Sequence, residues 1–423
     1  MLDFKFIREN RATVEGWLRK RRTDYPLDRL LTLDARRRAV ITSLQELRHR
    51  RNVVTGEVAA AKKAGRDASA QIRDMKAVGD RIAEMGKELA EVEKELGALE
   101  LRMPNAVHES VPDCAGEEES AVVRAWGEPK AGPAKDHIDI GVASGVIDME
   151  KAAETSGARF YYLKGALVRL NYALLQYAIE FGASKGFLPM QPPYMLKGAV
   201  MRGAVDMAAF EDSIYKLEGE DLYLLSTSEH ALLAYHSGEI LPGVRLPIRY
   251  LGVSSCFRRE AGAHGRDTKG IFRVHEFEKV EQFVFCRPED SWKEHELLAS
   301  NAEEFFRSLG IPHRLVNICS GDLGAPAAKK YDLEAWLPGQ GKYREMVSAS
   351  NCTDWQARRL SVKFRDKMGD EPVHVHTLNS TLVATERAMV AIMENYQRPD
   401  GGFDIPEALR KYMGGQTTVS PPA

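Results

Sequence analysis

The spacing of apolar side chains separates a long helical segment from a region of mixed pattern. Residues 27–103 contain no proline, although Pro26 and Pro104 stand at their two ends. Apolar residues in the second half of this segment recur at steps of three and four. They are Ile72, Met75, Val78, Ile82, Met85, Leu89, Val92, Leu96 and Leu99. A seam of this kind, kept up for almost four heptads, is typical of a coiled coil.

A looser seam occupies the first half of the same segment. It contains Leu30, Leu33, Val40, Leu44, Leu47, Val54, Val58 and Ala61. Gly65-Arg66-Asp67, followed by Ala68-Ser69, lies between the two seams. Glycine commonly ends a helix, and Asp or Ser can cap the next one. The pattern therefore predicts an antiparallel helical hairpin over about residues 27–103, with arms of about 50–55 Å at 1.5 Å per residue.

The rest of the chain mixes helical and strand periodicities. Gly165–Phe181 and Thr385–Tyr396 have helical patterns, whereas five shorter runs are β-rich. These runs are Phe187–Met190, Leu222–Leu225, Tyr250–Phe257, Phe272–Phe285 and Tyr343–Ser348. Because strands and helices do not strictly alternate, an α+β fold on an antiparallel sheet flanked by helices is favoured over a doubly wound fold.

Proline, glycine and a short acidic run mark the junction between these two regions. The acidic run is Glu117–Glu119, within a Pro/Gly-rich stretch near residues 104–135. This composition predicts a linker or an extended crossing segment. The predicted organisation is an N-terminal domain at 1–110 that carries the hairpin, a linker at 111–135 and a larger domain at 136–423.

Composition excludes several classes of protein. No run approaches the roughly 18 apolar residues of a membrane span, and residues 1–5 resemble neither a signal peptide nor a presequence, so we expect a cytoplasmic protein without membrane contact. The five cysteines form no CxxC pair. We expect them to be reduced thiols and expect no zinc site. They are Cys114, Cys256, Cys286, Cys319 and Cys352.

Charge is unevenly distributed along the hairpin, on a chain whose formal net charge is only −2. Residues 48–76 hold eight basic and three acidic side chains, a net charge of +5, whereas residues 77–103 are acidic. The basic residues are Arg48, Arg50, Arg51, Lys62, Lys63, Arg66, Arg73 and Lys76. This part of the hairpin is either a solvated coiled-coil surface or an arm that binds phosphates and loses affinity as salt rises.

Chemically capable residues are densest between Cys256 and Glu281. Two β-rich segments flank a loop with Gly262, Gly265 and Gly270. Strand alternation in the second segment places Arg273, Phe277 and Glu281 on one face. If this face lines a cavity, the three side chains suit a triphosphate, a base and a polar substrate group. The alternative is an exposed strand with cross-strand ion pairs. Because the chain has neither a P-loop nor a strand-GxGxxG-helix unit, side chains must bind any phosphates.

The same segment resembles motif 2 of class II aminoacyl-tRNA synthetases. The words Phe-Arg-Arg-Glu-Ala-Gly, Gly-Arg-Asp-Thr-Lys-Gly and Phe-Glu-Lys-Val-Glu are similar to the seryl branch. Leu378–Thr381, Thr385–Arg387 and Met393–Gln397 resemble motif 3, and Gly165–Phe181 with Gly186–Pro189 resembles motif 1. Thr227-Ser228-Glu229 resembles the family's TxE loop, and the hairpin is itself a mark of seryl enzymes. The resemblance covers nearly the whole chain.

The resemblance implies an ATP-dependent serine–tRNA ligase. Arg258 and Arg387 would be the catalytic residues, because Arg258 would hold the α-phosphate and Arg387, with Arg273, would hold the β- and γ-phosphates. Glu260 would accept from the adenine amino group and Phe277 would stack on the base. Glu345 and Ser348 would bind Mg²⁺, a hard ion that prefers oxygen ligands. The full ATP set implied is Arg258, Arg259, Glu260, Arg273, Val274, Phe277, Glu345, Met346, Val347, Ser348 and Arg387.

Serine recognition is implied for a second group of residues. The group comprises Thr227, Ser228, Glu229, Arg258, Glu281, Asn379 and Thr381. Glu281 would accept a hydrogen bond from the serine hydroxyl, and this would reject alanine because a buried acceptor would stay unpaired. The family also implies a homodimer formed through the motif 1 helix. Its tRNA(Ser) would be gripped by the basic hairpin, and the family also charges tRNA(Sec) where that tRNA exists.

One residue departs from the family pattern, and two alternative functions stay open. Glu386 precedes Arg387, where small or hydroxyl residues are usual; its carboxylate would either pair with Arg387 or point outward. A paralogue could form seryl-adenylate and pass serine to an acceptor other than tRNA, but its basic arm would then have no use. An inactive homologue could act as an RNA-binding or regulatory module, but the Arg258, Glu260, Glu281 and Arg387 set is intact.

Overall fold

The chain folds into two compact units in the computed structural model, which describes residues 2–130, 132–205, 211–260 and 269–422. The arm unit consists of Leu2–Arg19 and Thr23–Met103. The sheet unit consists of Lys20–Arg22 and Pro104–Ala423. Most of the glycine-rich loop predicted inside motif 2, residues 261–268, lies outside the described residues.

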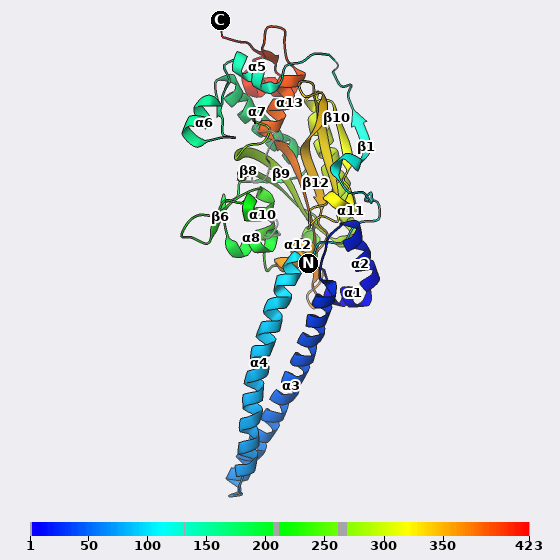
Figure 1. The fold of residues 1–423 in the computed structure, drawn as a ribbon, viewed down its shortest axis with the longest axis vertical. Helices are drawn as coiled ribbons and strands as arrows, with labels where there is room; N and C mark the ends of the chain where they lie inside the picture. Colours follow the sequence, from blue (N-terminus) through cyan, green and yellow to red (C-terminus); the bar gives the residue numbers. More distant parts are fainter. Residues whose placement is uncertain (1, 131, 206–210, 261–268, 423) are drawn as a thin grey trace. The chain divides into compact units, whose positions relative to one another are not determined.

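The arm unit is built on the predicted hairpin. Helices α3 (Leu27–Lys63) and α4 (Ser69–Arg102) run antiparallel (Figure 1). Gly65 has φ +68°, and the Asp67 carboxylate accepts from the backbone N–H of Ser69, so the turn lies where the sequence predicts it. The seam of α4 buries Val78, Met85, Val92 and Leu96. Ile72, the first residue predicted for that seam, is 45% exposed.

Ion pairs across the hairpin and a small core complete the arm unit. Arg29 pairs with Glu95 at 2.7 Å and Arg36 with Glu88 at 3.0 Å. Two short helices, α1 (Phe4–Glu9) and α2 (Arg11–Lys20), precede α3. Their buried side chains join those at the base of the hairpin in one core cluster.

The sheet unit contains a predominantly antiparallel sheet of eight strands, with only β4 and β8 parallel (Figure 1). Their order is β1 (Ala121–Trp126), β10 (His313–Asn317), β11 (Lys329–Leu337), β12 (Lys342–Asn351), β15 (His376–Ala384), β9 (Glu276–Cys286), β8 (Ile248–Phe257) and β4 (Leu188–Met190). The α+β fold with an antiparallel sheet is thereby confirmed. Strand β1 lies within the predicted linker, and it pairs with β10 at the sheet edge.

Helices and small strands surround this sheet. The helices are α5 (His137–Ala143), α6 (Glu150–Ser156), α7 (Ala166–Ser184), α8 (Gly198–Ala204), α10 (Ser228–Ala234), α11 (Ser291–Ser308), α12 (Trp355–Arg359), α13 (Thr385–Asn395) and α14 (Glu407–Arg410). The small strands are β2 (Ile147–Asp148), β3 (Tyr162–Leu163), β5 (Met195–Lys197), β6 (Leu222–Leu224), β7 (Ile240–Pro242), β13 (Lys363–Arg365), β14 (Val373–His374), β16 (Phe403–Asp404) and β17 (Thr418–Val419). One core cluster includes residues of α7, α11 and α13, and a second includes residues of α8, α10 and α12.

Two of the cysteines differ from the sequence prediction. Cys114 and Cys319 form a disulfide, so the expectation of five reduced thiols is wrong for this pair. The two residues are 205 positions apart, and tertiary contacts bring them together: the Ser320 N–H donates to Pro112 O and the Gly321 N–H to Cys114 O. Cys256, Cys286 and Cys352 are free and buried.

The described residues show neither a membrane-spanning helix nor a cluster of metal ligands. None of the helices in this part of the chain combines the length and apolar character needed to span a bilayer. The described residues also contain no group of three or more His, Cys, Asp or Glu side chains placed to hold a metal ion.

Candidate active site

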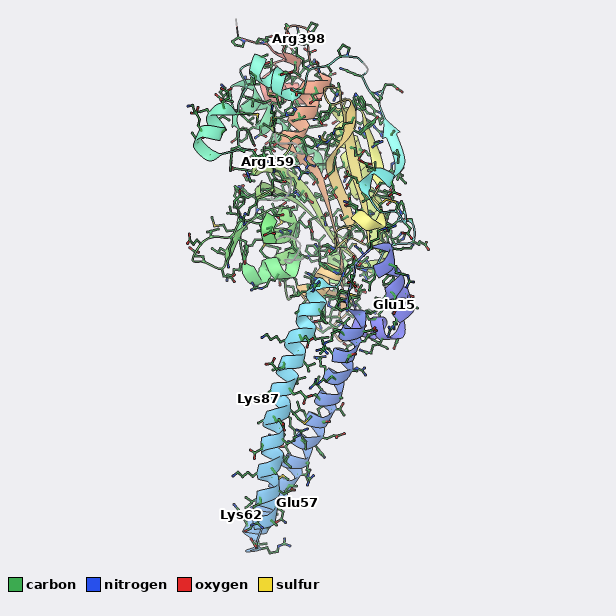
Figure 2. All side chains as sticks on the ribbon, viewed as in Figure 1. Glu15, Glu57, Lys62, Lys87, Arg159 and Arg398 are labelled. Atoms are coloured by element: carbon green, nitrogen blue, oxygen red, sulfur yellow. A yellow bond between two sulfur atoms is a disulfide. The ribbon has the colours of Figure 1, made fainter. Side chains whose placement is uncertain are left out.

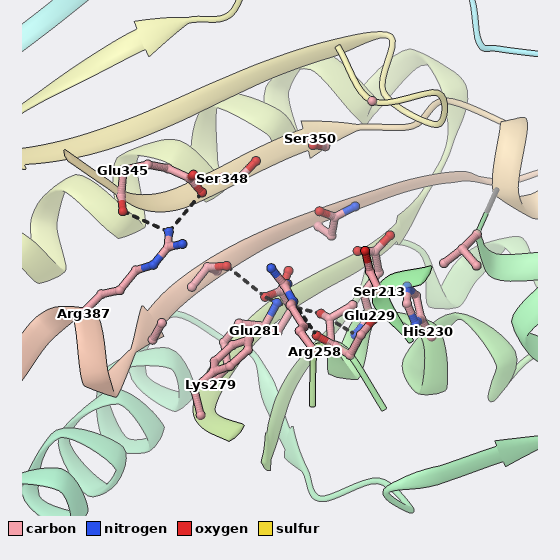
Figure 3. Close-up of a pocket in the computed structure, with 18 of the residues that line it drawn as sticks. Ser213, Glu229, His230, Arg258, Lys279, Glu281, Glu345, Ser348, Ser350 and Arg387 are labelled. Carbon is pink, nitrogen blue, oxygen red and sulfur yellow. Dashed lines mark hydrogen bonds and ion pairs between the residues drawn. The ribbon is translucent and has the colours of Figure 1, made fainter. Parts of the chain in front are cut away.

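A cavity of about 510 Å³ in the sheet unit gathers most of the predicted site residues. Its walls come from β9, β12 and β15, from the start of α10 and from the segment after β8. The predicted residues that line it are Thr227, Glu229, Arg258, Glu260, Arg273, Val274, Phe277, Glu281, Glu345, Met346, Ser348, Asn379, Thr381 and Arg387. Figure 3 shows that Glu345, Ser348 and Arg387 lie at one end, and Glu229, Arg258, Lys279 and Glu281 at the other.

Three residues predicted with the site are not among the described residues that line the cavity. Ser228 is fully buried, and its Oγ donates to Gly252 O on β8 at 3.4 Å. Val347 is buried in the core, on a strand position that faces away from its neighbours Met346 and Ser348. Arg259 is exposed, and its backbone N–H donates to Ser213 O at 2.9 Å.

A β-bulge explains why Glu345 and Ser348 share the cavity although they are three positions apart. Side chains of a regular strand alternate, so residues i and i+3 face opposite sides. In the pairing of β11 with β12, Leu333 lies opposite Val347 while Glu334 lies opposite Glu345, which leaves Met346 as the extra residue. One extra residue reverses the alternation, and both oxygen-bearing side chains therefore face the same space.

A second bulge lies on the neighbouring strand β15. Here Thr381 pairs with Glu281 and Val383 with Val280, so Leu382 is the extra residue. Thr381 and Ala384 both line the cavity as a result. The two bulges stand on adjacent strands of the sheet, and β15 is buried along all but its first residue, so hydrophobic alternation gives no signal for its bulge in the sequence.

Alternation of side chains along the predicted strand accounts for only some of the residues on one cavity wall. Phe277, Lys279 and Glu281 alternate on β9 and line the cavity, as the pattern predicts. The segment before Glu276 is not strand, so the predicted extension of the strand back to Phe272 is wrong. Arg273 still lines the cavity, and so do Phe272 and Val274, although strict alternation from Arg273 would place these two on the opposite face.

Arg387 and Arg273 line the cavity, and each pairs with a carboxylate there. The Arg387 guanidinium lies 3.3 Å from the Glu345 carboxylate and donates to the Glu345 carbonyl at 2.9 Å. Its centre is 4.9 Å from the centroid of the Phe272 ring. Arg273 donates to Glu260 at 2.8 Å. Arginine at such positions offers a planar set of donors that matches phosphate oxygens.

Buried polar groups gather at the opposite end. Thr227 is the N-cap of α10, and its hydroxyl accepts from the Glu229 N–H at 3.3 Å. The buried ammonium of Lys279 lies 2.6 Å from Thr227 Oγ1 and 2.6 Å from Glu281 Oε2. Thr381 Oγ1 donates to the same carboxylate oxygen at 3.2 Å. This end therefore provides a fixed acceptor beside a fixed cation, in a space shielded from water.

The pKa of Glu229 is raised to about 7, first by burial and then by the nearby Glu281 carboxylate. The side-chain amide of Gln356 on α12 donates to Glu229 Oε1 at 2.6 Å, and Gln356 in turn accepts from the Thr377 hydroxyl at 2.7 Å. A group with this pKa is neutral below about pH 7 and ionised above it.

This pKa makes the binding of a substrate ammonium depend on pH. If Glu229 accepts from the amino group of an amino acid, KM for that amino acid should rise about tenfold between pH 8 and pH 6, because one proton must leave for binding. Initial rates at saturating ATP would measure the profile. Glu229→Gln should raise KM at pH 8 and remove the slope, whereas a profile that is flat in the unmodified chain would refute the assignment.

Glu386 has neither of the two arrangements predicted for it. Its carboxylate is buried, accepts from Tyr161 OH at 2.6 Å and accepts from the Glu278 N–H at 3.1 Å. Arg387 pairs with Glu345 instead. Burial raises the pKa of Glu386 to about 7. The carboxyl thus links the start of α13 to β9 and to the segment before β3.

Several cavity residues were missed by the sequence reasoning. Lys279 alternates with Phe277 and Glu281, so the strand pattern did carry a signal for it. His230 lines the cavity, its Nδ1 has no hydrogen-bond partner within the described part of the chain, and burial lowers its pKa to about 3. Lys330 and Cys352 also line the cavity, and their sequence surroundings give no sign of it.

The fold and this cavity agree with the class II aminoacyl-tRNA synthetases that the sequence resembles. Residues 213–396 match the family described as the tRNA synthetase class II core domain (G, H, P, S and T). Residues 1–107 match the family described as the seryl-tRNA synthetase N-terminal domain.

Comparisons over the full length of the chain identify the family within this class. Serine–tRNA ligase of Nitrosopumilus maritimus is 50% identical over 421 residues, covering 99% of this chain and 100% of that protein. The crystal structure of seryl-tRNA synthetase from Pyrococcus horikoshii complexed with ATP has a TM-score of 0.94 and 46% identity, with full coverage of both chains. The cytoplasmic enzyme of Naegleria fowleri in complex with AMP has a TM-score of 0.89 and 39% identity, with 100% and 99% coverage. The chain belongs to the seryl-tRNA synthetase family.

Proposed function

We propose that the chain activates L-serine with ATP to form seryl-adenylate and pyrophosphate, and then transfers serine to the 3′ end of tRNA(Ser). One observation carries the proposal. A single cavity combines a buried Lys279–Glu281 pair, suited to a small hydroxylated amino acid, with three lining arginines, Arg258, Arg273 and Arg387, suited to a triphosphate. Membership of the family supports the same reaction.

Positioning and charge neutralisation account for the first step. The serine carboxylate attacks the α-phosphorus of ATP, the bond to the β-phosphate oxygen breaks, and pyrophosphate leaves. Arg258 would neutralise charge at the α-phosphate while Arg273 and Arg387 hold the leaving phosphates, so no protein side chain has to become covalently attached. Phe277 would stack on adenine, and Glu260 would accept from its amino group.

The oxygen groups near Arg387 fit a divalent cation. Glu345 and the Ser348 hydroxyl face the same end of the cavity. Behind them Asp332, which pairs with Ser348 across the strands, has a buried oxygen Oδ1 without a hydrogen-bond partner within the described residues. Glu345 and Ser348 would hold Mg²⁺, which when bound neutralises charge on the phosphates.

Serine selection would depend on the buried pair. Glu281, fixed by Lys279 and Thr381, would accept from the substrate hydroxyl, and Thr227, Glu229 and Asn379 would surround the amino group. Alanine would leave the buried Glu281 acceptor without its partner, which disfavours alanine strongly. The extra methyl group of threonine would be excluded by shape.

Serine-dependent ATP–pyrophosphate exchange, assayed beside aminoacylation of bulk tRNA with labelled serine, tests the proposal. Both activities are expected. Exchange without acylation of any tRNA would favour the paralogue that passes serine to another acceptor. Absence of both activities in folded protein supplied with Mg²⁺ would refute the proposal that the chain is an enzyme.

The arm supports tRNA as the acceptor. All eight basic residues in the tip half of the hairpin are exposed, and Figure 2 labels Lys62 close to the tip and Lys87 farther along α4. Replacing Lys62 and Lys63 by glutamine should raise KM for tRNA about tenfold at physiological salt and make it less dependent on salt, because two phosphate contacts are lost. Pyrophosphate exchange should stay unchanged.

A matched variant distinguishes the loss of specific tRNA contacts from the loss of positive charge as such. Lys87 and Lys94 are also exposed on the hairpin but lie in its acidic half. Replacing both by glutamine removes the same charge and should leave KM for tRNA within about twofold, if contacts are confined to the tip half. Equal effects of the two double variants would contradict a specific binding role of the tip.

A homodimer formed through α7 is part of the proposal. The helix exposes Val168 and Tyr172, and β4, at one edge of the main sheet, exposes Leu188. Apolar side chains along a helix and a strand edge are suited to a second copy that would cover both. A monomer in sedimentation velocity at micromolar concentration would contradict this part.

A further inference from the structure

Residues 323–328, which have no regular secondary structure, contribute to one wall of the cavity. Each backbone carbonyl of this segment accepts a hydrogen bond from a residue outside it. Gly324, Pro326 and Ala327 line the cavity. All six carbonyls from Leu323 to Ala328 accept hydrogen bonds from Arg21, Asn105 or His108. Arg21 donates to Leu323 O at 3.2 Å, Gly324 O at 3.3 Å and Ala327 O at 2.5 Å; Asn105 donates to Ala325 O and Pro326 O, both at 2.8 Å; the His108 N–H donates to Ala328 O at 3.0 Å.

Arg21 is the main donor of this set, and it stands about 300 positions before the segment it holds. Its side chain is only 5% exposed. Two further bonds join it to Asn105 O at 2.9 Å and Ala106 O at 3.3 Å. Burial lowers the pKa of the guanidinium to about 10. A planar group with five N–H donors can bind carbonyls that fan around it, which a lysine ammonium with three donors cannot reproduce.

Asn105 extends the support to a second part of the wall. Its side-chain nitrogen also donates to Cys352 O at 2.8 Å and to Thr353 Oγ1 at 3.0 Å. Cys352 lines the cavity, and its Sγ accepts from Asn379 Nδ2 at 3.6 Å. Burial and then the Glu229 carboxylate raise the pKa of the Cys352 thiol. Arg21 and Asn105 therefore brace the wall next to Glu229 and Asn379.

We propose that Arg21 and Asn105 are positioning residues for the amino-acid end of the cavity. The inference rests on the proposed function, because it takes that end as the serine site. The two side chains touch no substrate. They fix the backbone of 323–328 and of 352–353, so that Asn379, Cys352 and the facing wall keep the size and shape of the space offered to serine.

The test compares Arg21→Met, Arg21→Lys and Asn105→Ser in steady-state ATP–pyrophosphate exchange, with active sites counted by burst titration. Positioning predicts that KM for serine rises at least tenfold in Arg21→Met and Asn105→Ser while KM for ATP stays within twofold. For Arg21→Lys, KM for serine should lie between the values for these two variants and that of the unmodified chain, because lysine keeps the charge but not all of the hydrogen-bond donors. Arg19→Met, at an exposed arginine two positions away, should match the unmodified chain.

A purely structural role gives a different result. Loss of stability would reduce the fraction of active sites and the apparent kcat but would leave both KM values unchanged in the molecules that remain folded. Unchanged KM for serine in Asn105→Ser and Arg21→Lys, or an equal rise of both KM values, would therefore overturn the inference. Failure of the unmodified chain and Arg19→Met to catalyse exchange would instead count against the proposed function. If Arg21→Met does not fold, the two milder variants decide the question.

Discussion

Replacing Arg258 by methionine is expected to lower kcat/KM for serine-dependent pyrophosphate exchange by about 10²–10³-fold, the loss typical of removing one preorganised donor from a transition state. The residue follows β8 directly and lines the cavity. Its Nε donates to Ser226 O at 3.3 Å, and its guanidinium centre lies 5.1 Å from the centroid of the Phe277 ring. The side chain is thus held in place before substrates bind.

A matched control for Arg258 is Arg245→Met, which removes an exposed guanidinium elsewhere in the sheet unit. It should leave exchange within about twofold, since exposed substitutions away from a site have small effects. Thermal unfolding of Arg258→Met would exclude loss of the fold as the cause. A fall of less than tenfold in folded Arg258→Met would mean that other groups neutralise the reacting phosphate.

Replacing Lys279 by methionine is expected to destabilise the sheet unit by about 3–5 kcal/mol, because Glu281 would become a buried charge without its counter-ion. The side chains of the pair are 7% and 2% exposed, and their charged atoms are 2.6 Å apart. Thr227 would also lose its donor. Urea unfolding followed by tryptophan fluorescence would measure the change, with Trp355 fully buried in this unit.

The double variant Lys279→Met with Glu281→Leu distinguishes charge from packing. Replacing a buried ion pair by apolar groups is often neutral or stabilising, so the double variant should recover most of the stability lost by Lys279→Met. Serine-dependent exchange should be absent in the double variant, because Glu281, the acceptor for the serine hydroxyl, is gone. A double variant less stable than Lys279→Met would show that the two residues contribute through packing and not mainly through charge.

The periodicity of apolar residues predicted those helices and strands in which residues close in sequence pack against the same part of the fold. The heptad seam predicted the hairpin, because the buried apolar residues of α4 from Val78 onward share one partner helix, and Gly65 with Asp67 predicted its turn. Alternation on β9 brought Phe277 and Glu281 to one cavity wall, since both lie in a regular strand. The roles assigned to individual residues of the cavity remain predictions that the variants above would test.

Features that depend on tertiary contact had no such signal. Arg21 and the wall at 323–328 meet only in the folded chain, and so do Cys114 and Cys319. A bulge also leaves no mark in hydrophobic periodicity when the strand is buried on both faces, as β15 is. Glu386 lay in a recognisable motif, but whether its carboxylate would turn to Arg387 or to Tyr161 depended on groups from other elements.

The paired bulges at Met346 and Leu382 have a consequence for the shape of the sheet. A bulge bends its strand and increases the local twist, and two of them on adjacent strands bend the same region twice. A flat sheet of eight strands would present a plane, on which a nucleotide could lie but could not be enclosed. At these two positions the hydrogen-bond ladder departs from regular pairing, so both strands are expected to bend there. The shape of the cavity therefore depends on the bends of these two strands as well as on the size of the side chains that line it.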